Sequence, residues 1–189
     1  MMDTVIKNDN KKDLLLENIL NDIYLLPKWE MIKSFSLTEK HLFFHKKILN
    51  VNLFRKFSSK HLLEKYCIKA ENDNILARMD LKVYKDSVYI INLEINSALN
   101  FERLMEFLLQ AAIEKALYNT TKKEVVYNFT SNLITGGRIR KLLINNEFIP
   151  ADNQSSYEKN MFGEIFSIKA DSDSLWMKKI RQMPILINK

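Results

Sequence analysis

The sequence predicts an α+β protein in which helices flank a mixed, mostly antiparallel sheet. Between residues 66 and 95, three strand patterns follow one another through short polar turns, which is typical of an antiparallel meander. A helix pattern over residues 100–117 then separates the strand at 88–95 from another apolar strand at 124–130. A helix of that length allows the two strands to lie parallel. The sequence therefore predicts one βαβ step within an otherwise antiparallel sheet.

The N-terminal part predicts a helix followed by a strand. Residues 13–26 carry leucine and isoleucine at helical spacing, with Asp13 as the cap and Pro27 at the end. Residues 29–35 have the composition of a short strand. We therefore expect residues 1–28 to form a helical extension, which either covers the sheet or mediates a homodimer.

The next segment predicts two helices. Ser36 begins the tetrapeptide SLTE, which matches a capping box with Glu39 three positions later. Apolar residues follow inside that helix, namely Leu42, Phe43, Ile48 and Leu49. A second short helix is expected over residues 54–63.

The most apolar strand pattern, residues 88–95, is expected at the centre of the sheet because it has too many successive apolar residues for an exposed edge. The main domain is expected over residues 29–170, with a C-terminal extension at 171–189. The expected elements of these parts, in chain order, are strands at 66–70, 75–84 and 88–95, a helix at 100–117, a strand at 124–130, a helix at 138–145 entered through Gly136 and Gly137, a return from Phe148 to Pro150, a hairpin of 157–162 and 164–170 around Gly163, and a helix at 175–183.

The composition indicates one globular domain and excludes several classes. Hydrophobic residues make up 47% of the 189 residues, and only three glycines and three prolines occur. A single cysteine, Cys67, excludes an intramolecular disulfide and a multi-cysteine zinc site, and it is expected to be a buried thiol. No apolar run is long enough to cross a membrane. Acidic residues interrupt the apolar N-terminal stretch, so a signal peptide is rejected and a cytoplasmic location is expected.

The positive charge is concentrated in residues 40–65, which carry seven lysines and arginines against Glu64 alone. This surplus indicates either a solvated lysine-rich face or a surface for an anionic partner. Nucleic acid is the weaker alternative, because no RNA-binding aromatic motif and no helix-turn-helix pattern accompanies the charge.

The order of these elements resembles that of the GCN5-related N-acetyltransferase (GNAT) family. VYIINLEI resembles the family's central strand, and EVVYNFT resembles the strand that splays away from it. RKLLINNEF resembles the family segment that ends in a Gly-Phe step, and it retains the phenylalanine as Phe148. The resemblance implies that the donor, acetyl-CoA or a longer acyl-CoA, lies between the two splayed strands.

The chain departs from the family pattern at the donor loop. NFERLM, residues 100–105, covers the place where relatives carry a glycine-rich loop for the pyrophosphate, and it contains no glycine. Phe101 and Glu102 place bulk and a carboxylate where backbone amides would approach phosphate. Leu143 stands at the family's general-acid tyrosine position, and Gly136 stands at its asparagine position with Asn132 nearby. An acyl-carrier protein is therefore an alternative donor.

The resemblance implies roles for several residues. Glu94 matches the region of the general base, with a solvent-facing or lysine-paired strand residue as the alternative. Tyr127 and Tyr157 are candidate proton donors, with core or rim packing as the alternative. The candidate donor-binding residues are Ile95, Asn96, Asn100, Arg103, Asn128, Thr130 and Arg138.

A metal site is not expected. His41 and His45 share a helical face near Glu39, but the HExxH glutamate is missing and no third ligand is evident. Gly136 and Gly137 precede a helix and could cradle phosphate with help from Arg138, although a plain turn is the commoner meaning of a glycine pair.

Two functions follow from these observations. The first is an N-acyltransferase that moves an acyl group from a thioester to an amine of a small molecule or protein. The alternative is an inactive GNAT-fold binding or regulatory protein. An open gap between the strands of Glu94 and Asn128 favours the first, and a gap filled by Phe101, Met105 or residues 175–186 favours the second.

Overall fold

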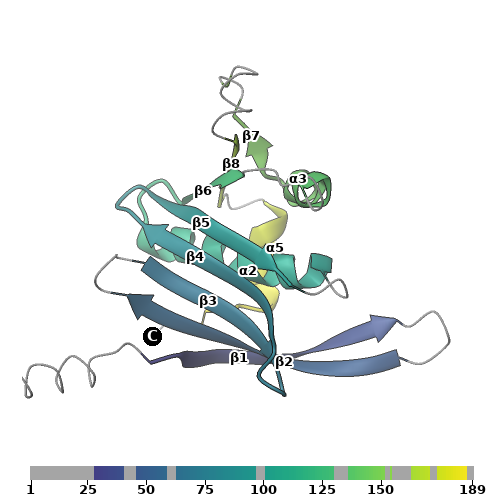
Figure 1. The fold of residues 1–189 in the computed structure, drawn as a ribbon. Helices are drawn as coiled ribbons and strands as arrows, with labels where there is room; N and C mark the ends of the chain where they lie inside the picture. Colours follow the sequence, from purple (N-terminus) through teal and green to yellow (C-terminus); the bar gives the residue numbers. More distant parts are fainter. Residues whose placement is uncertain are drawn as a thin grey trace, which may run out of the picture.

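The structure is a computed structural model, and it describes residues 28–40, 46–58, 63–96, 101–129, 136–151, 154, 163–170 and 174–186. Eight strands form one sheet in the order β1-β2-β3-β4-β5-β6-β8-β7, and helices flank it (Figure 1). All neighbouring strands are antiparallel except β5 and β6, which are parallel. The elements are β1 (Glu30–Lys40), β2 (Lys46–Ser58), β3 (Leu63–Ala70), β4 (Ile75–Val83), β5 (Ser87–Ile95), α2 (Phe101–Asn119), β6 (Glu124–Phe129), α3 (Gly136–Asn145), β7 (Ile149–Pro150), β8 (Glu164–Lys169) and α5 (Leu175–Gln182).

The predicted α+β class, the meander and the βαβ step are confirmed. β3, β4 and β5 pair in succession, and β5 lies between β4 and β6 as a central strand. Helix α2 joins β5 to the parallel strand β6. The helix expected at 13–26, the strand expected at 157–162 and the two histidines 41 and 45 lie outside the described residues.

The two helices expected between residues 36 and 63 are wrong wherever the structure describes this segment. Residues up to Lys40 belong to β1, and residues 46–58 form β2. The capping-box residue Ser36 instead donates a hydrogen bond across the ladder, from its Oγ to Oδ1 of Asn50 at 2.8 Å.

The physical reason is the alternation in LNVNL, residues 49–53. Val51 and Leu53 are fully buried, whereas Asn50 and Asn52 turn to the other face and accept hydrogen bonds from serines of β1. This period of two places one apolar side on the core, and it outweighs a four-residue capping signal. β2 continues beyond its pairing with β3, which begins at Val51, so β1 and β2 extend past the sheet as a two-stranded arm (Figure 1).

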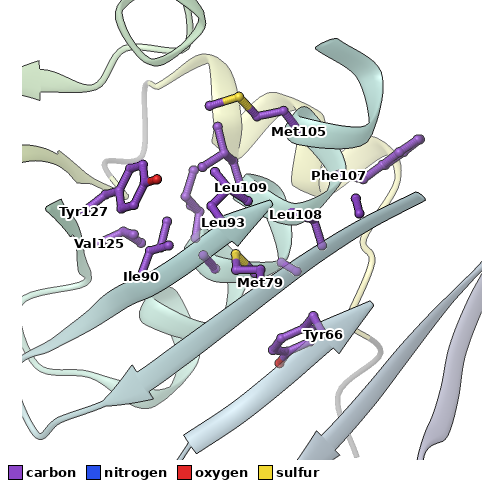
Figure 2. Close-up of a cluster of buried hydrophobic side chains, with 14 of the residues drawn as sticks. Tyr66, Met79, Ile90, Leu93, Met105, Phe107, Leu108, Leu109, Val125 and Tyr127 are labelled. Carbon is purple, nitrogen blue, oxygen red and sulfur yellow. The ribbon is translucent and has the colours of Figure 1, made fainter. Parts of the chain in front are cut away.

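The core lies between the sheet and α2. The helix packs on β4, β5 and β6, and it buries leucine, methionine and alanine side chains along one face. Figure 2 shows Leu108 and Leu109 of the helix beside Met79, Ile90 and Leu93 of the sheet. Each fully buried leucine or isoleucine contributes about 1.5–3 kcal/mol. This packing fixes where the N-terminus of α2 lies relative to the end of β5.

A buried ion pair ties α2 to β3. The Lys115 Nζ lies 2.6 Å from Glu64 Oε1, and the Tyr66 hydroxyl donates to Glu64 Oε2 at 2.8 Å. Burial, together with the Glu64 carboxylate, raises the pKa of Tyr66 well above its usual value. The carboxylate is thus matched by a cation and a donor, as a buried charge requires.

The C-terminal segment packs against α2 and the end of α3. The Trp176 indole is fully buried and donates to the Asn146 carbonyl at 2.8 Å. The Glu114 carboxylate of α2 is also fully buried, and it accepts backbone N–H bonds from Ile185 at 2.7 Å and Leu186 at 2.5 Å. Gln110 donates to the same carboxylate at 2.9 Å. Glu114 therefore holds the segment after α5 on the helix.

Replacing Glu114 with alanine is expected to lower the free energy of unfolding by about 2–4 kcal/mol, because two buried amides lose their acceptor. Burial raises the pKa of Glu114, an effect that its hydrogen bonds only partly offset. The native state therefore binds this proton more tightly than the unfolded state, and the contribution of Glu114 to stability falls as pH rises above about 4.5. Urea unfolding should show a larger loss for Glu114→Ala at pH 5 than at pH 8.

The matched control is Glu102→Ala, which removes an exposed carboxylate from the first turn of the same helix. We expect a change within about 1 kcal/mol for that variant. Equal losses for Glu114→Ala at the two pH values would contradict the proton linkage.

Candidate active site

The site is built where β5 and β6 separate. Their parallel pairing covers only residues 87–90 of β5 and 124–127 of β6, although β5 continues to Ile95. Beyond Ile90, the edge of β5 that faces β6 has no ladder partner among the described residues. Unpaired backbone amides and carbonyls on this edge are free to hydrogen-bond an extended ligand.

A β-bulge occurs at the same place. Asp80 pairs with Asn92 and Leu81 pairs with Ile90, so Ile91 is an extra residue in β5. In a regular strand Ile90 and Glu94 would share a face, because side chains alternate with a period of two. The extra residue turns Glu94 to the face opposite α2, while Ile90 and Leu93 both stay buried. The bulge therefore decides on which side of the sheet the Glu94 carboxylate lies.

Tyr127 lies at the last paired position, opposite Ile90. Its side chain is buried on the α2 face, where Figure 2 shows it with Ile90 and Val125 and with its hydroxyl on the side of Leu93 and Met105. Burial raises the pKa of Tyr127 to about 12, so the hydroxyl keeps its proton at neutral pH. Within the described part of the chain, this hydroxyl has no hydrogen-bond partner. A buried hydroxyl without a protein partner is uncommon, and a water or a ligand can supply the missing hydrogen bond.

The N-termini of α2 and α3 lie close together, beside the gap that opens where β5 and β6 separate. Both helices follow the carboxyl ends of the parallel strands β5 and β6, so both begin at the same edge of the sheet. The Arg138 guanidinium lies 4.4 Å from the centre of the Phe101 ring. Phe101 is buried, whereas Arg138 is exposed. The arginine thus places a positive charge at the edge of the gap, next to two helix N-termini that favour anions.

A polar hollow of about 380 Å³ lies on the opposite face of the sheet. Glu94 lines it and accepts a hydrogen bond from the Asn92 amide at 3.1 Å. Cys67 also borders the hollow through β3. The prediction of a buried thiol is confirmed, and burial raises its pKa. The charged and amide side chains of the hollow are Lys65, Lys69, Arg78, Asp80, Asn92 and Glu94.

The structure brings together some of the predicted site residues. Glu94 and Ile95 lie on the free part of β5, and Asn128 follows Tyr127 on β6. The Asn96 amide continues the β5 ladder by donating to the Leu76 carbonyl at 2.8 Å. Asn100, Thr130 and Tyr157 lie outside the described residues.

Arg103 lies away from Arg138. Its guanidinium pairs with Glu106 at 3.0 Å and borders a groove between α2 and α5. Arg140 is also engaged, because its guanidinium forms two bonds to the Glu164 carboxylate at 2.9 and 3.2 Å. Among these three arginines, only Arg138 lies at the edge of the gap.

The glycines mark one close contact at the site. Gly163 has a φ of +88°, and a Cβ there would lie 2.6 Å from the Phe129 carbonyl oxygen. Gly163, directly before β8, thus packs tightly against the end of β6. Gly137, in the first turn of α3, has open space around its Cβ position and so shows no comparable close approach.

The C-terminal segment hydrogen-bonds to α2, to the end of α3 and, through the Pro184 carbonyl, to Lys33 of β1. Phe101 and Met105 are buried in the core on the α2 side. Sequence reasoning missed Arg78, which lies directly opposite Glu94 in the β4–β5 ladder. The signal was available, because Arg78 and Asp80 are polar residues alternating with apolar ones in β4.

Two kinds of feature are absent from the described residues. No three histidine, cysteine, aspartate or glutamate side chains are grouped there in a way that could hold a metal ion. None of the helices described is both long and apolar enough to cross a bilayer.

Comparisons with known proteins give no sequence relative. No protein-family model matches the chain, and no curated protein matches it either. Among solved structures, the chain is similar to a nourseothricin acetyltransferase, with 11% sequence identity and a TM-score of 0.38. That similarity covers 77% of this chain and 99% of the acetyltransferase.

Proposed function

We propose that the protein transfers an acyl group from a thioester to an amine. The observation that carries the proposal is the gap after Ile90 and Tyr127, where strand pairing ends and a buried hydroxyl lacks a partner among the described residues. The α2 side of this gap offers Tyr127, and the opposite face offers Glu94. A donor and an acceptor that approach from opposite faces would meet between the two strands.

The donor arm fits the free edge of β5. An extended chain with amide groups, such as the pantetheine arm shared by acyl-CoA and acyl-carrier protein, can bond to backbone groups of residues 92–95 in the manner of an added strand. Arg138 would supply positive charge for a phosphate at the edge of the gap. The buried Phe101 ring leaves no glycine-type loop at the start of α2, so we assign the phosphate to side-chain rather than backbone donors.

Each candidate residue has one role in the reaction. Glu94 accepts a proton from the acceptor amine as its nitrogen attacks the thioester carbonyl carbon. Collapse of the tetrahedral intermediate breaks the C–S bond, and the Tyr127 hydroxyl protonates the departing thiolate. The products are an amide and a free thiol. Backbone amides of β5 beyond the bulge are positioned to stabilise the oxyanion.

A thermal-shift experiment tests the donor. A saturating acyl-CoA or acyl-carrier protein, at about 100 times its Kd, should stabilise the protein by about 2.7 kcal/mol. This corresponds to a rise in Tm of roughly 5–10 °C for a chain of this size. The variant Arg138→Ala should reduce the rise for phosphate-bearing donors, and Arg103→Ala is the matched control on α2. If no thioester donor of either kind shifts Tm, the proposed function is wrong.

An inactive binding protein is the second candidate. Its support is the burial of Phe101 and Met105 on the α2 side of the gap, where the GNAT resemblance implies a glycine loop. The two functions differ in turnover. Release of free thiol from a bound donor in the presence of amines supports transfer, and donor binding without thiol release supports the binding protein.

A further inference from the structure

The polar hollow beside Glu94 contains one cation without a carboxylate partner in the described chain. Lys65 pairs with Asp80 at 3.6 Å, and Lys69 pairs with Asp73 at 3.2 Å. Arg78 forms no ion pair or hydrogen bond with any described residue, although it lines the same hollow. Its side chain is exposed to that hollow.

Arg78 and Glu94 are direct neighbours across the β4–β5 ladder. Side chains at directly opposite positions have Cβ atoms about 4.5–5.5 Å apart, which is close enough for an ion pair. The two groups nevertheless form no ion pair in the described structure, and the Glu94 carboxylate accepts a hydrogen bond from Asn92 at 3.1 Å. The hollow therefore presents a guanidinium and a carboxylate side by side, each with free bonding capacity.

We propose that the acceptor is a zwitterion of the amino-acid type, with Arg78 binding its carboxylate and Glu94 receiving the proton of its amine. The amine and carboxylate of an α-amino acid are separated by a single carbon, which matches two side chains of one cross-strand pair. A guanidinium binds a carboxylate through two parallel hydrogen bonds and so fixes its orientation. This inference rests on the proposed acyl transfer and specifies its acceptor. Arg78 acts as a positioning and specificity residue.

Binding to the purified protein without donor tests the proposal directly. Titration calorimetry with the proteinogenic L-amino acids should identify at least one that binds. Its amide and its decarboxylated amine should bind about 10–100-fold more weakly, because each lacks the charge-assisted bonds to Arg78. Arg78→Gln should remove this difference, and Arg78→Lys should restore part of it.

Lys82→Gln is the control, since Lys82 lies on the same face of β4 but outside the hollow, with its ammonium over the Tyr84 ring. In acyl-transfer assays, Arg78→Gln should raise KM for the amino acid and leave KM for the decarboxylated amine unchanged. The proposal would be overturned if the amino acid and its decarboxylated amine bound equally well, or if neither bound. It would also be overturned if Arg78→Gln weakened the binding of both by the same factor. If only this proposal is wrong, the donor should still raise Tm, and a simple amine should still cause thiol release. If both of these effects are absent, the proposed acyl transfer is wrong instead.

Discussion

Tyr127→Phe is expected to stabilise the protein while lowering its turnover. The Tyr127 hydroxyl is buried without a hydrogen-bond partner in the described structure, so its removal relieves the cost of burying a polar group. We expect a gain of about 1 kcal/mol in the free energy of unfolding, or ~2–4 °C in Tm. Under the proposed acyl transfer, Tyr127→Phe removes the proton donor and should lower kcat by about 10²–10⁴-fold. Differential scanning calorimetry and a thiol-release assay measure the two effects.

The same substitution at Tyr66 is the control. Tyr66 is also buried, but its hydroxyl donates to Glu64 at 2.8 Å. Tyr66→Phe should therefore destabilise the protein, by about 1–3 kcal/mol. A destabilised Tyr127→Phe would contradict the assignment of an unsatisfied hydroxyl, and an unchanged kcat would show that another group protonates the thiolate.

Glu94→Gln is expected to lower kcat by about 10²–10⁴-fold with little change in stability. The glutamine keeps the shape of the side chain and can still accept from Asn92, but it cannot take a proton from the amine. Since Glu94 is exposed on the face opposite α2, the change removes no core packing.

Glu124→Gln provides the comparison for Glu94. Glu124 lies at the start of β6, where its carboxylate accepts from Ser87 at 3.2 Å, at the other end of the paired strands. Its replacement should leave kcat unchanged. Equal rates for wild type and Glu94→Gln would exclude the carboxylate as the base and move that role to another group in the hollow.

The meander and the βαβ step were predictable from the sequence because their signals agree with one another. β3, β4 and β5 are apolar strands bounded by polar turns, and α2 has a continuous apolar face. The segment of β1 and β2 carried conflicting signals. A local capping motif at Ser36 indicated a helix, whereas the alternation over residues 49–53 indicated a strand, and burial of Val51 and Leu53 decided the outcome.

The candidate site was predictable only in part. Its strands followed from the order of elements, which placed Glu94 and Tyr127 near each other along the sheet. The face on which Glu94 lies depends on a bulge that leaves no mark in composition. The partner of each arginine depends on tertiary contacts that the sequence does not show. The sequence therefore did not distinguish Arg138, which lies beside the gap, from Arg103, which borders the groove between α2 and α5.

The bulge at Ile91 also bears on how such a site can arise. Inserting one residue in a strand rotates everything after it by half a turn, so core and surface positions exchange without any substitution. If residues 90–94 all paired regularly, without the bulge, Glu94 would point into the core beneath α2 and Leu93 would be exposed. The bulge absorbs this one residue, so Leu93 and Glu94 keep the faces that they would have in a shorter strand without Ile91, and a deletion at this position would leave both side chains where they are.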